Sequence, residues 1–187
     1  MTMTREWQGL TLPEPGTFTL DPTHAEVGFV AKHMMFAKVR GSFADVSGTL
    51  EVGETPESSS VEVAIKTDSV TTGAADRDNH LRSDDFFDVV TYPDMTFRST
   101  EIRATGGSDF ILAGDLTIRG VTKPVELNAT LEGVGDNPWG VQIVGVSARA
   151  EIDREDWGLT WNANLEAGGV LVGKRVKLEI EAEFNRA

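Results

Sequence analysis

The sequence contains no cysteine among its 187 residues. The absence of thiols excludes disulfide bonds, zinc–thiolate sites and a cysteine nucleophile. The sequence also has no continuous apolar run approaching the ~18 residues that a membrane-spanning helix needs. The first ten residues lack the apolar core of an export signal, so the expected location of the protein is the cytoplasm.

Positive charge is scarce. Lys and Arg total 17 against 30 for Asp and Glu, which gives a formal net charge of −13. An acidic chain is repelled by nucleic-acid phosphates and by anionic membranes unless a local basic patch intervenes. Because 40% of the residues are hydrophobic, the chain has enough apolar surface for one ordinary globular domain.

The dominant pattern is a period-two alternation of apolar and polar residues. From Val176 to Phe184, for example, apolar residues alternate with lysine and glutamate. Successive side chains of a β-strand point to opposite faces, so each such segment has one apolar face. About nine segments share the pattern, which predicts an all-β, antiparallel barrel or sandwich: 18–20, 27–31, 46–52, 61–65, 97–103, 110–118, 125–131, 141–152 and 176–184.

The segment 71–92 differs from the strands. It carries helix-forming residues around 74–81, followed by acidic residues beside Phe86 and Phe87. We expect one or two short helical segments here, covering an end of the β structure. Turn residues rich in Gly, Asn and Pro separate the neighbouring strands at 119–124 and 133–138.

Chemical motifs in the sequence are incomplete. The run Gly168–Arg175 has the glycine spacing of a phosphate-binding loop, but Arg175 stands where a magnesium-binding Ser or Thr is needed and a strand pattern follows. Asp76, Asp78 and His80 have the spacing of a calcium loop without its essential glycine. The sequence therefore predicts no metal site and no cofactor.

One cationic cluster stands out from the acidic background. Lys32, His33, Lys38 and Arg40 flank the apolar stretch 34–37. Apolar residues beside cations suit an amphiphile that has an apolar tail and an anionic head group. The alternative interpretation is a hairpin with ordinary surface charges.

Several motifs occur in an order that resembles a known family. They are the segments 18–29 followed by His33 and 41–43, then 80–88, 92–97, 114–120 with 123–125, and 152–158, with His24, Asp84 and Trp157 among their residues. Together they run from about Thr17 to Phe184 and resemble the YceI-like lipid- and polyisoprenoid-binding proteins. The resemblance implies an eight-stranded antiparallel lipocalin-like barrel whose pore takes a long-tailed lipid such as an isoprenoid quinone or prenyl intermediate. It also implies no enzymatic role, and it makes a homodimer an expectation.

These considerations define the expected domain and site. Residues 17–185 should form the barrel, with 1–16 as an N-terminal extension. Lys38 and Arg40 are candidates for contact with a head group, and seven apolar residues are candidates for the pore lining: Phe29, Phe43, Val63, Phe97, Leu116, Leu127 and Leu178. Two alternatives stay open. One is an interaction or stress-response scaffold that binds no lipid, and the other is an acid–base enzyme that uses His80 or a carboxylate of 84–88 on a bound lipid.

Overall fold

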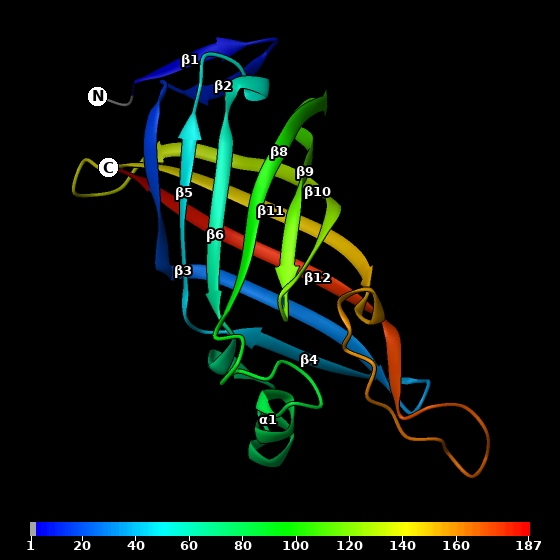
Figure 1. Ribbon diagram of the computed structural model, residues 1–187. Helices are drawn as coiled ribbons and strands as arrows, with labels where there is room; N and C mark the ends of the chain where they lie inside the picture. The colour runs from blue at the N-terminus through cyan, green and yellow to red at the C-terminus, as the bar shows by residue number, and fades with distance from the viewer. Residues whose placement is uncertain (1–2) are drawn as a thin grey trace.

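Eight antiparallel strands close into a barrel in the computed structural model, which describes residues 3–187 (Figure 1). Each strand pairs with the next, and the last strand pairs back onto the first, so the eight strands form a closed ring. The all-β, eight-stranded antiparallel architecture predicted above is therefore confirmed. The barrel strands are β3 (Gly16–His33), β5 (Val46–Val52), β6 (Ser60–Lys66), β8 (Asp94–Gly106), β9 (Asp109–Ile118), β10 (Val121–Asp136), β11 (Gln142–Asp153) and β12 (Val172–Arg186).

The long strand β3 joins two parts of the barrel. Its first residues pair with β5, and its last seven pair with β4 (Ala37–Phe43), which extends the wall and carries the short β7 (Val70–Thr71). The register with β12 shifts within β3, since Leu20 pairs with Phe184 but Ala25 pairs with Ala182. Residues 21–24 therefore bulge out opposite Glu183, and bulges of this kind redirect side chains.

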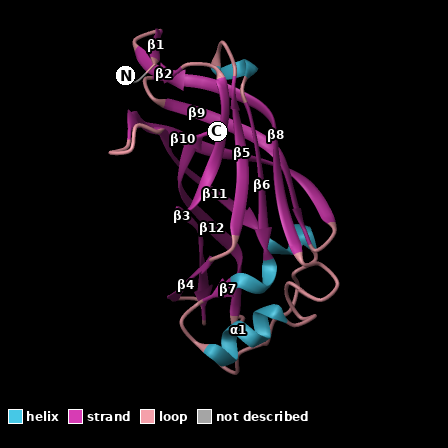
Figure 2. Cartoon of the chain, turned by 90° about the vertical axis from the view of Figure 1, so that its left-hand side faces the viewer, coloured by secondary structure: helices cyan, strands magenta, loops and turns pink. Residues whose placement is uncertain are grey.

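Short helices lie mainly at one end of the barrel, as the pattern of 71–92 predicted (Figure 2). Asp78 anchors α1 because its Oδ1 accepts hydrogen bonds from the Thr72 backbone N–H, at 2.7 Å, and from the Thr72 hydroxyl, at 2.6 Å. Of residues 3–187, none belongs to a helix with the length and hydropathy needed to cross a bilayer. The helices are α1 (Ala75–Arg82) and the 3₁₀ turns η1 (Pro56–Ser58), η2 (Thr67–Ser69) and η3 (Arg154–Trp157).

A second, two-stranded sheet covers the opposite end of the barrel. It is the hairpin of β1 (Thr4–Trp7) and β2 (Leu10–Pro13), which falls within the segment expected to be an extension. Leu12 is buried against the barrel rather than exposed. The two ends of the barrel are thus covered by different parts of the chain.

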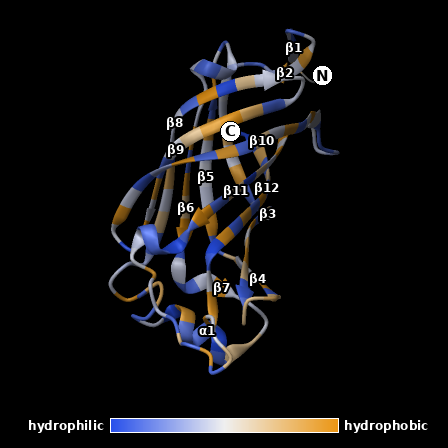
Figure 3. Ribbon diagram, turned by 90° about the vertical axis from the view of Figure 1, so that its right-hand side faces the viewer, coloured by the Kyte–Doolittle hydropathy of each residue, from blue (hydrophilic) through white to orange (hydrophobic). Residues whose placement is uncertain are grey.

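Apolar and polar residues alternate along the barrel strands (Figure 3). Along β9, for example, Leu116 and Ile118 are buried whereas Asp115 is exposed. Phe18 and Val70 are fully buried near the two ends of the wall. The alternation therefore gives the barrel an apolar interior and a charged exterior, as period-two patterning requires.

Candidate ligand-binding cavity

The barrel encloses a cavity of about 350 Å³. All seven apolar residues selected from the sequence lie on its wall, contributed by seven different strands: Phe29, Phe43, Val63, Phe97, Leu116, Leu127 and Leu178. Their contact with a ligand stays a prediction. The wall also contains small residues, including Ala31, Ala129 and Ala182, which leave room between the larger side chains.

Aromatic rings shape one side of the cavity. The ring centroid of Phe43 lies 5.8 Å from that of Phe29 and 5.5 Å from that of Phe87, the latter in an edge-to-face arrangement. Phe29 covers Gly41 of the neighbouring strand, and Phe97 covers Gly114 in the same way. A Cβ atom at either glycine would collide with the ring, so these glycines permit the aromatic side chains to lie flat along the wall.

The two cations selected from the sequence lie elsewhere. Lys38 and Arg40 are exposed and lie on one face of β4. Gly41 lies on the opposite face, where its Cβ position faces the Phe29 ring. Arg40 pairs instead with Glu179 on the outer surface, with 3.3 Å between Nη1 and Oε2. Neither cation is among the described residues that line the cavity. Head-group contact by these two side chains stays a prediction, and it would require the head group to lie outside the barrel.

A buried arginine at the α1 end was missed by the sequence reasoning. Arg154 lines the cavity and is only 6% exposed, and its guanidinium donates to the backbone oxygens of Leu159, at 2.6 Å, and Gly173, at 2.9 Å. Burial lowers the pKa of this guanidinium, although the neighbouring carboxylates of Asp153 and Glu155 oppose the shift. Its position in the motif 152–158, close to Trp157, is the feature of the sequence that could have identified it. A charged residue that is buried beside a tryptophan needs an internal hydrogen-bond partner.

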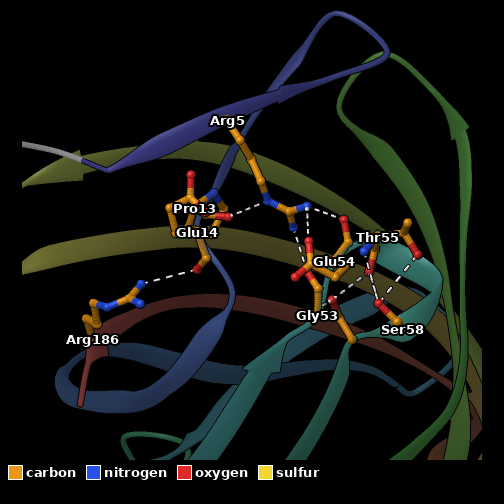
Figure 4. A network of polar contacts seen from close by, with 9 residues as sticks. Arg5, Pro13, Glu14, Gly53, Glu54, Thr55, Ser58 and Arg186 are labelled. Carbon is orange, nitrogen blue, oxygen red and sulfur yellow. Dashed lines mark hydrogen bonds and ion pairs between the residues drawn. The ribbon is translucent and has the colours of Figure 1, made fainter.

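The opposite end is closed by a network of backbone contacts (Figure 4). Arg5 of β1 donates to the carbonyl oxygens of Pro13, Gly53 and Glu54, which ties the hairpin to the loop after β5. Arg186 of β12 donates to the carbonyl oxygen of Glu14 at 3.2 Å. Leu12, Pro13 and Arg5 all line the cavity, so the N-terminal hairpin forms part of the site.

Polar residues are rare on the cavity wall. Of its 44 residues within the described chain, only Arg5, Ser59, Thr130 and Arg154 have polar side chains. Arg5 and Arg154 lie at opposite ends of the barrel and bond to backbone carbonyls. The wall therefore suits an apolar molecule, and no group of polar side chains converges on one point.

The pair His80 and Asp85 lies outside the cavity wall. His80 Nε2 is 2.8 Å from Asp85 Oδ2, and its ring packs edge-on against Trp161 with 4.5 Å between centroids. Neither residue is among the described lining residues, whereas the adjacent Leu81, Phe86 and Phe87 are. The α1 end thus brings a histidine–carboxylate pair close to the cavity without opening onto it.

A second polar cluster forms at the bulge of β3. Ligand atoms of Asp21, His24 and Glu183 lie within 4.8 Å of one another, a residue set that could hold a metal ion. Thr23 and His24 already donate to the Asp21 carboxylate, which holds its pKa well below the ordinary value. The Asp21 hydrogen bond and the Glu183 charge raise the pKa of His24. Hydrogen bonding within the cluster, in which only His24 is exposed, accounts for its geometry without an ion.

The glycine-rich run before β12 has no phosphate-binding geometry. Gly168 and Gly169 have φ values of +88° and +91°, and β12 follows from Val172. A phosphate-binding loop requires a helix N-terminus at this point. The strand pattern recognised after this run in the sequence is therefore confirmed as β12.

The fold and the cavity define a class: a closed antiparallel β-barrel with an apolar interior and covered ends, the architecture of proteins that enclose a small ligand. A model of the YceI-like domain matches residues 18–184, and this chain belongs to the YceI-like domain family.

Relatives by sequence and by structure agree with this assignment. Protein YceI of Escherichia coli is 43% identical over 137 residues, covering 73% of this chain and 71% of that protein. A UPF0312 protein of Pectobacterium atrosepticum is 41% identical over 153 residues, covering 81% of this chain and 79% of that protein. The crystal structure of a Campylobacter jejuni YceI protein superposes with a TM-score of 0.72 at 32% identity, covering 83% of this chain and 90% of that one.

A more distant structure shares the fold alone. A polyisoprenoid-binding domain from Saccharophagus degradans superposes with a TM-score of 0.67 at 20% identity, covering 93% of this chain and all of that domain.

Proposed function

We propose that this protein binds one long-chain apolar lipid, of the isoprenoid class, in the barrel cavity and carries it without chemical change. The observation that supports the proposal is the apolar cavity of about 350 Å³ inside the barrel. An engineered apolar cavity of roughly 150 Å³ is already large enough to admit benzene. Filling the larger space with a hydrocarbon tail removes the tail from water, which is the main driving force.

The affinity should depend chiefly on tail length. Drug-sized ligands gain about 0.3 kcal/mol per non-hydrogen atom. On this basis a tail of about twenty carbons gains about 6 kcal/mol and one of about forty gains about 12 kcal/mol, which corresponds to dissociation constants from tens of micromolar to nanomolar. Because few polar side chains line the wall, the head group contributes little selectivity.

The choice of isoprenoids has separate support. The sequence motifs resemble those of polyisoprenoid-binding proteins, and the Saccharophagus degradans domain carries that name, although at 20% identity it shares only the fold with this chain. Methyl-branched tails also suit a wall that alternates Ala31, Ala129 and Ala182 with aromatic rings. Residence in the cytoplasm and formation of a homodimer remain predictions.

The proposal can be tested by identifying what the protein binds. Native mass spectrometry of the purified protein should show an added mass that organic extraction removes. Protein refolded from denaturant without lipid should then bind isoprenoid alcohols with an affinity that increases with length, and should bind saturated alcohols of equal carbon number more weakly. No extractable lipid, together with no affinity for either series, would contradict the proposal.

One observation favours a second candidate, an acid–base enzyme acting on the bound lipid. The hydrogen bond between His80 and Asp85 resembles the pairing that orients a catalytic imidazole. Its position beside Phe86 puts it near the cavity. Conversion of a bound lipid that is lost in His80→Ala, while lipid binding is retained, would favour the enzyme. Unchanged lipid in both proteins would favour the carrier.

A further inference from the structure

Two distant segments form a projecting lobe at one corner of the barrel's α1 end. The basic lobe, as we name it, comprises residues 29–41, which form the β3–β4 hairpin, and residues 157–178, which lead into β12 (Figure 1). The Met34 backbone N–H donates to the Leu171 carbonyl oxygen at 2.8 Å, and Val172 pairs with His33. The Met35 side chain lies over Gly169, where a Cβ atom would come within 3.1 Å of Met35 Cγ. The two segments therefore form one surface.

The basic lobe reverses the charge of the rest of the protein. Its only acidic residue is Glu166, and it contains six cations: Lys32, Lys38, Arg40, Lys174, Arg175 and Lys177. The lobe thus carries a formal charge of +5, which leaves −18 on the remainder of a chain whose total is −13.

The lysines nearest the tip of the lobe are free to meet an external anion. Arg40, Lys174 and Arg175 pair with carboxylates near the base of the lobe. Within the described chain, Lys32 and Lys38 flank the tip without an ion pair. They also form a cross-strand pair, so two positive charges lie side by side next to the tip.

The tip itself presents apolar side chains to solvent. Met34, Met35 and Phe36 are 40%, 55% and 79% exposed. Met34 and Met35 have φ values of +51° and +72°, a left-handed backbone that favours glycine or asparagine at both positions of such a turn. Turn chemistry therefore does not account for three apolar residues here, whereas a requirement for an apolar tip does.

The tip lies a few residues from the cavity wall along the chain, although Met34, Met35 and Phe36 do not line the cavity themselves. Ala31 lines the cavity and precedes Met34 by three residues, a distance of about 10 Å along a strand. Val172 and Leu159 of the lobe also line the cavity. A surface that held the tip would therefore bring the end of the cavity close to it.

We propose that the basic lobe docks onto the surface of an anionic lipid bilayer, with Met34, Met35 and Phe36 inserted among the head groups and Lys32 and Lys38 against lipid phosphates. Charge complementarity argues for this occupant, because apolar side chains flanked by cations are the combination that binds an anionic interface. The acidic remainder of the chain is repelled by such a surface, which favours approach through the lobe. This docking goes beyond the proposed function and does not require the cavity to hold any lipid.

The proposal is tested by flotation of the full-length protein with vesicles. We expect binding to vesicles of phosphatidylglycerol and phosphatidylcholine in equal parts, and weaker binding at high salt. Met35→Ser/Phe36→Ser should reduce the partition coefficient tenfold or more. Lys32→Gln/Lys38→Gln should reduce it about fivefold per lysine on the anionic vesicles and have little effect on pure phosphatidylcholine.

Matched controls separate docking from general effects. Trp139→Ser removes a large apolar side chain, 84% exposed, at the other end of the barrel, and Lys66→Gln/Lys123→Gln removes the same charge outside the lobe. Both should bind vesicles as the unmodified protein does. Phe36→Trp keeps an apolar tip, so it should retain binding, and its added fluorescence should shift to shorter wavelength on vesicles.

Three results would overturn the proposal. The first is no binding of the folded protein to the anionic vesicles. The second is equal loss of binding in the tip and control variants. The third is a protein dimer in solution that the Met35→Ser/Phe36→Ser variant abolishes while vesicle binding persists, since the tip would then serve a second copy of the chain. Failure of lipid binding in the cavity with vesicle binding intact would reject the carrier function and leave the docking surface in place.

Discussion

Narrowing the cavity should raise the free energy of unfolding of the lipid-free protein and weaken its binding of lipid. Ala129 of β10 and Ala148 of β11 are cross-strand partners, and both line the cavity. Replacing both with leucine adds three carbons at each position and directs them into the enclosed space. The double variant Ala129→Leu/Ala148→Leu therefore tests whether the interior is hollow at this level.

The expected magnitude follows from burial. Six added carbons at about 0.8 kcal/mol each contribute about 5 kcal/mol. Fixing two leucine side chains costs about 0.5–1 kcal/mol each. The free energy of unfolding of the lipid-free protein should therefore rise by about 3 kcal/mol. In a fully packed interior the same atoms would overpack the core. The free energy of unfolding would then fall by about 1–3 kcal/mol for each substitution.

The effect on binding has the opposite sign. Six wall atoms displace a similar number of ligand atoms, which at about 0.3 kcal/mol each costs about 2 kcal/mol, or about twentyfold in affinity. Urea unfolding of refolded, lipid-free protein gives the change in unfolding free energy, and titration with an isoprenoid alcohol gives the change in affinity.

Ala113→Leu is the control, since Ala113 lies on β9 between Glu101 and Glu126 on the neighbouring strands and does not line the cavity. Its unfolding free energy should change by less than about 0.5 kcal/mol. A destabilised double variant that binds lipid normally would refute the reasoning.

Four further predictions, made with three variants, concern polar and backbone contacts. Asp21→Asn should lower the pKa of His24 toward its ordinary value of 6.5, as followed by NMR titration, because the hydrogen bond with Asp21 is the largest cause of the raised pKa; an unchanged titration would show that another group is responsible. The low pKa of Asp21, caused first by the Thr23 hydroxyl, stabilises the fold above pH 3.8, and this contribution is lost as the pH falls further, so Asp21→Asn should weaken the acid dependence of unfolding. Arg154→Met should lower the urea-unfolding free energy by about 3 kcal/mol by leaving buried carbonyl oxygens unpaired, and a loss below about 1 kcal/mol would contradict that role. Gly114→Ala should lower the melting temperature because its Cβ would meet the Phe97 ring and the Arg98 carbonyl oxygen, and an unchanged melting temperature would show that the ring moves without cost.

Many of the residues that line the cavity could be predicted from the sequence, because side chains along a strand alternate with a period of two. Once a segment such as 110–118 is recognised as a strand, its apolar positions must share one face, and the closed barrel directs that face inward. The alternation alone therefore identifies Leu116 and Leu127 as interior residues, and both line the cavity. The order of the motifs identified the family for the same reason, since they mark the strands and turns of one barrel.

The covers at the two ends could not be predicted from local pattern. Arg5 and Arg154 have charged neighbours in sequence, yet their hydrogen-bond partners include backbone carbonyls of distant segments. Asp21 and His24 lie close to Glu183 only because β3, near the start of the sequence, pairs with β12, near its end. Long-range contacts of this kind leave no periodic signal.

The sequence by itself determined which side chains face inward, because strand geometry is local and repeats every two residues. Only the tertiary structure decided that the interior is hollow. A cavity is the difference between the volume that the closed barrel encloses and the volume that its inward side chains occupy, and the enclosed volume depends on strand number, tilt and register. Those quantities arise from pairing between distant segments, such as β3 with β12, and so they exist only in the folded chain.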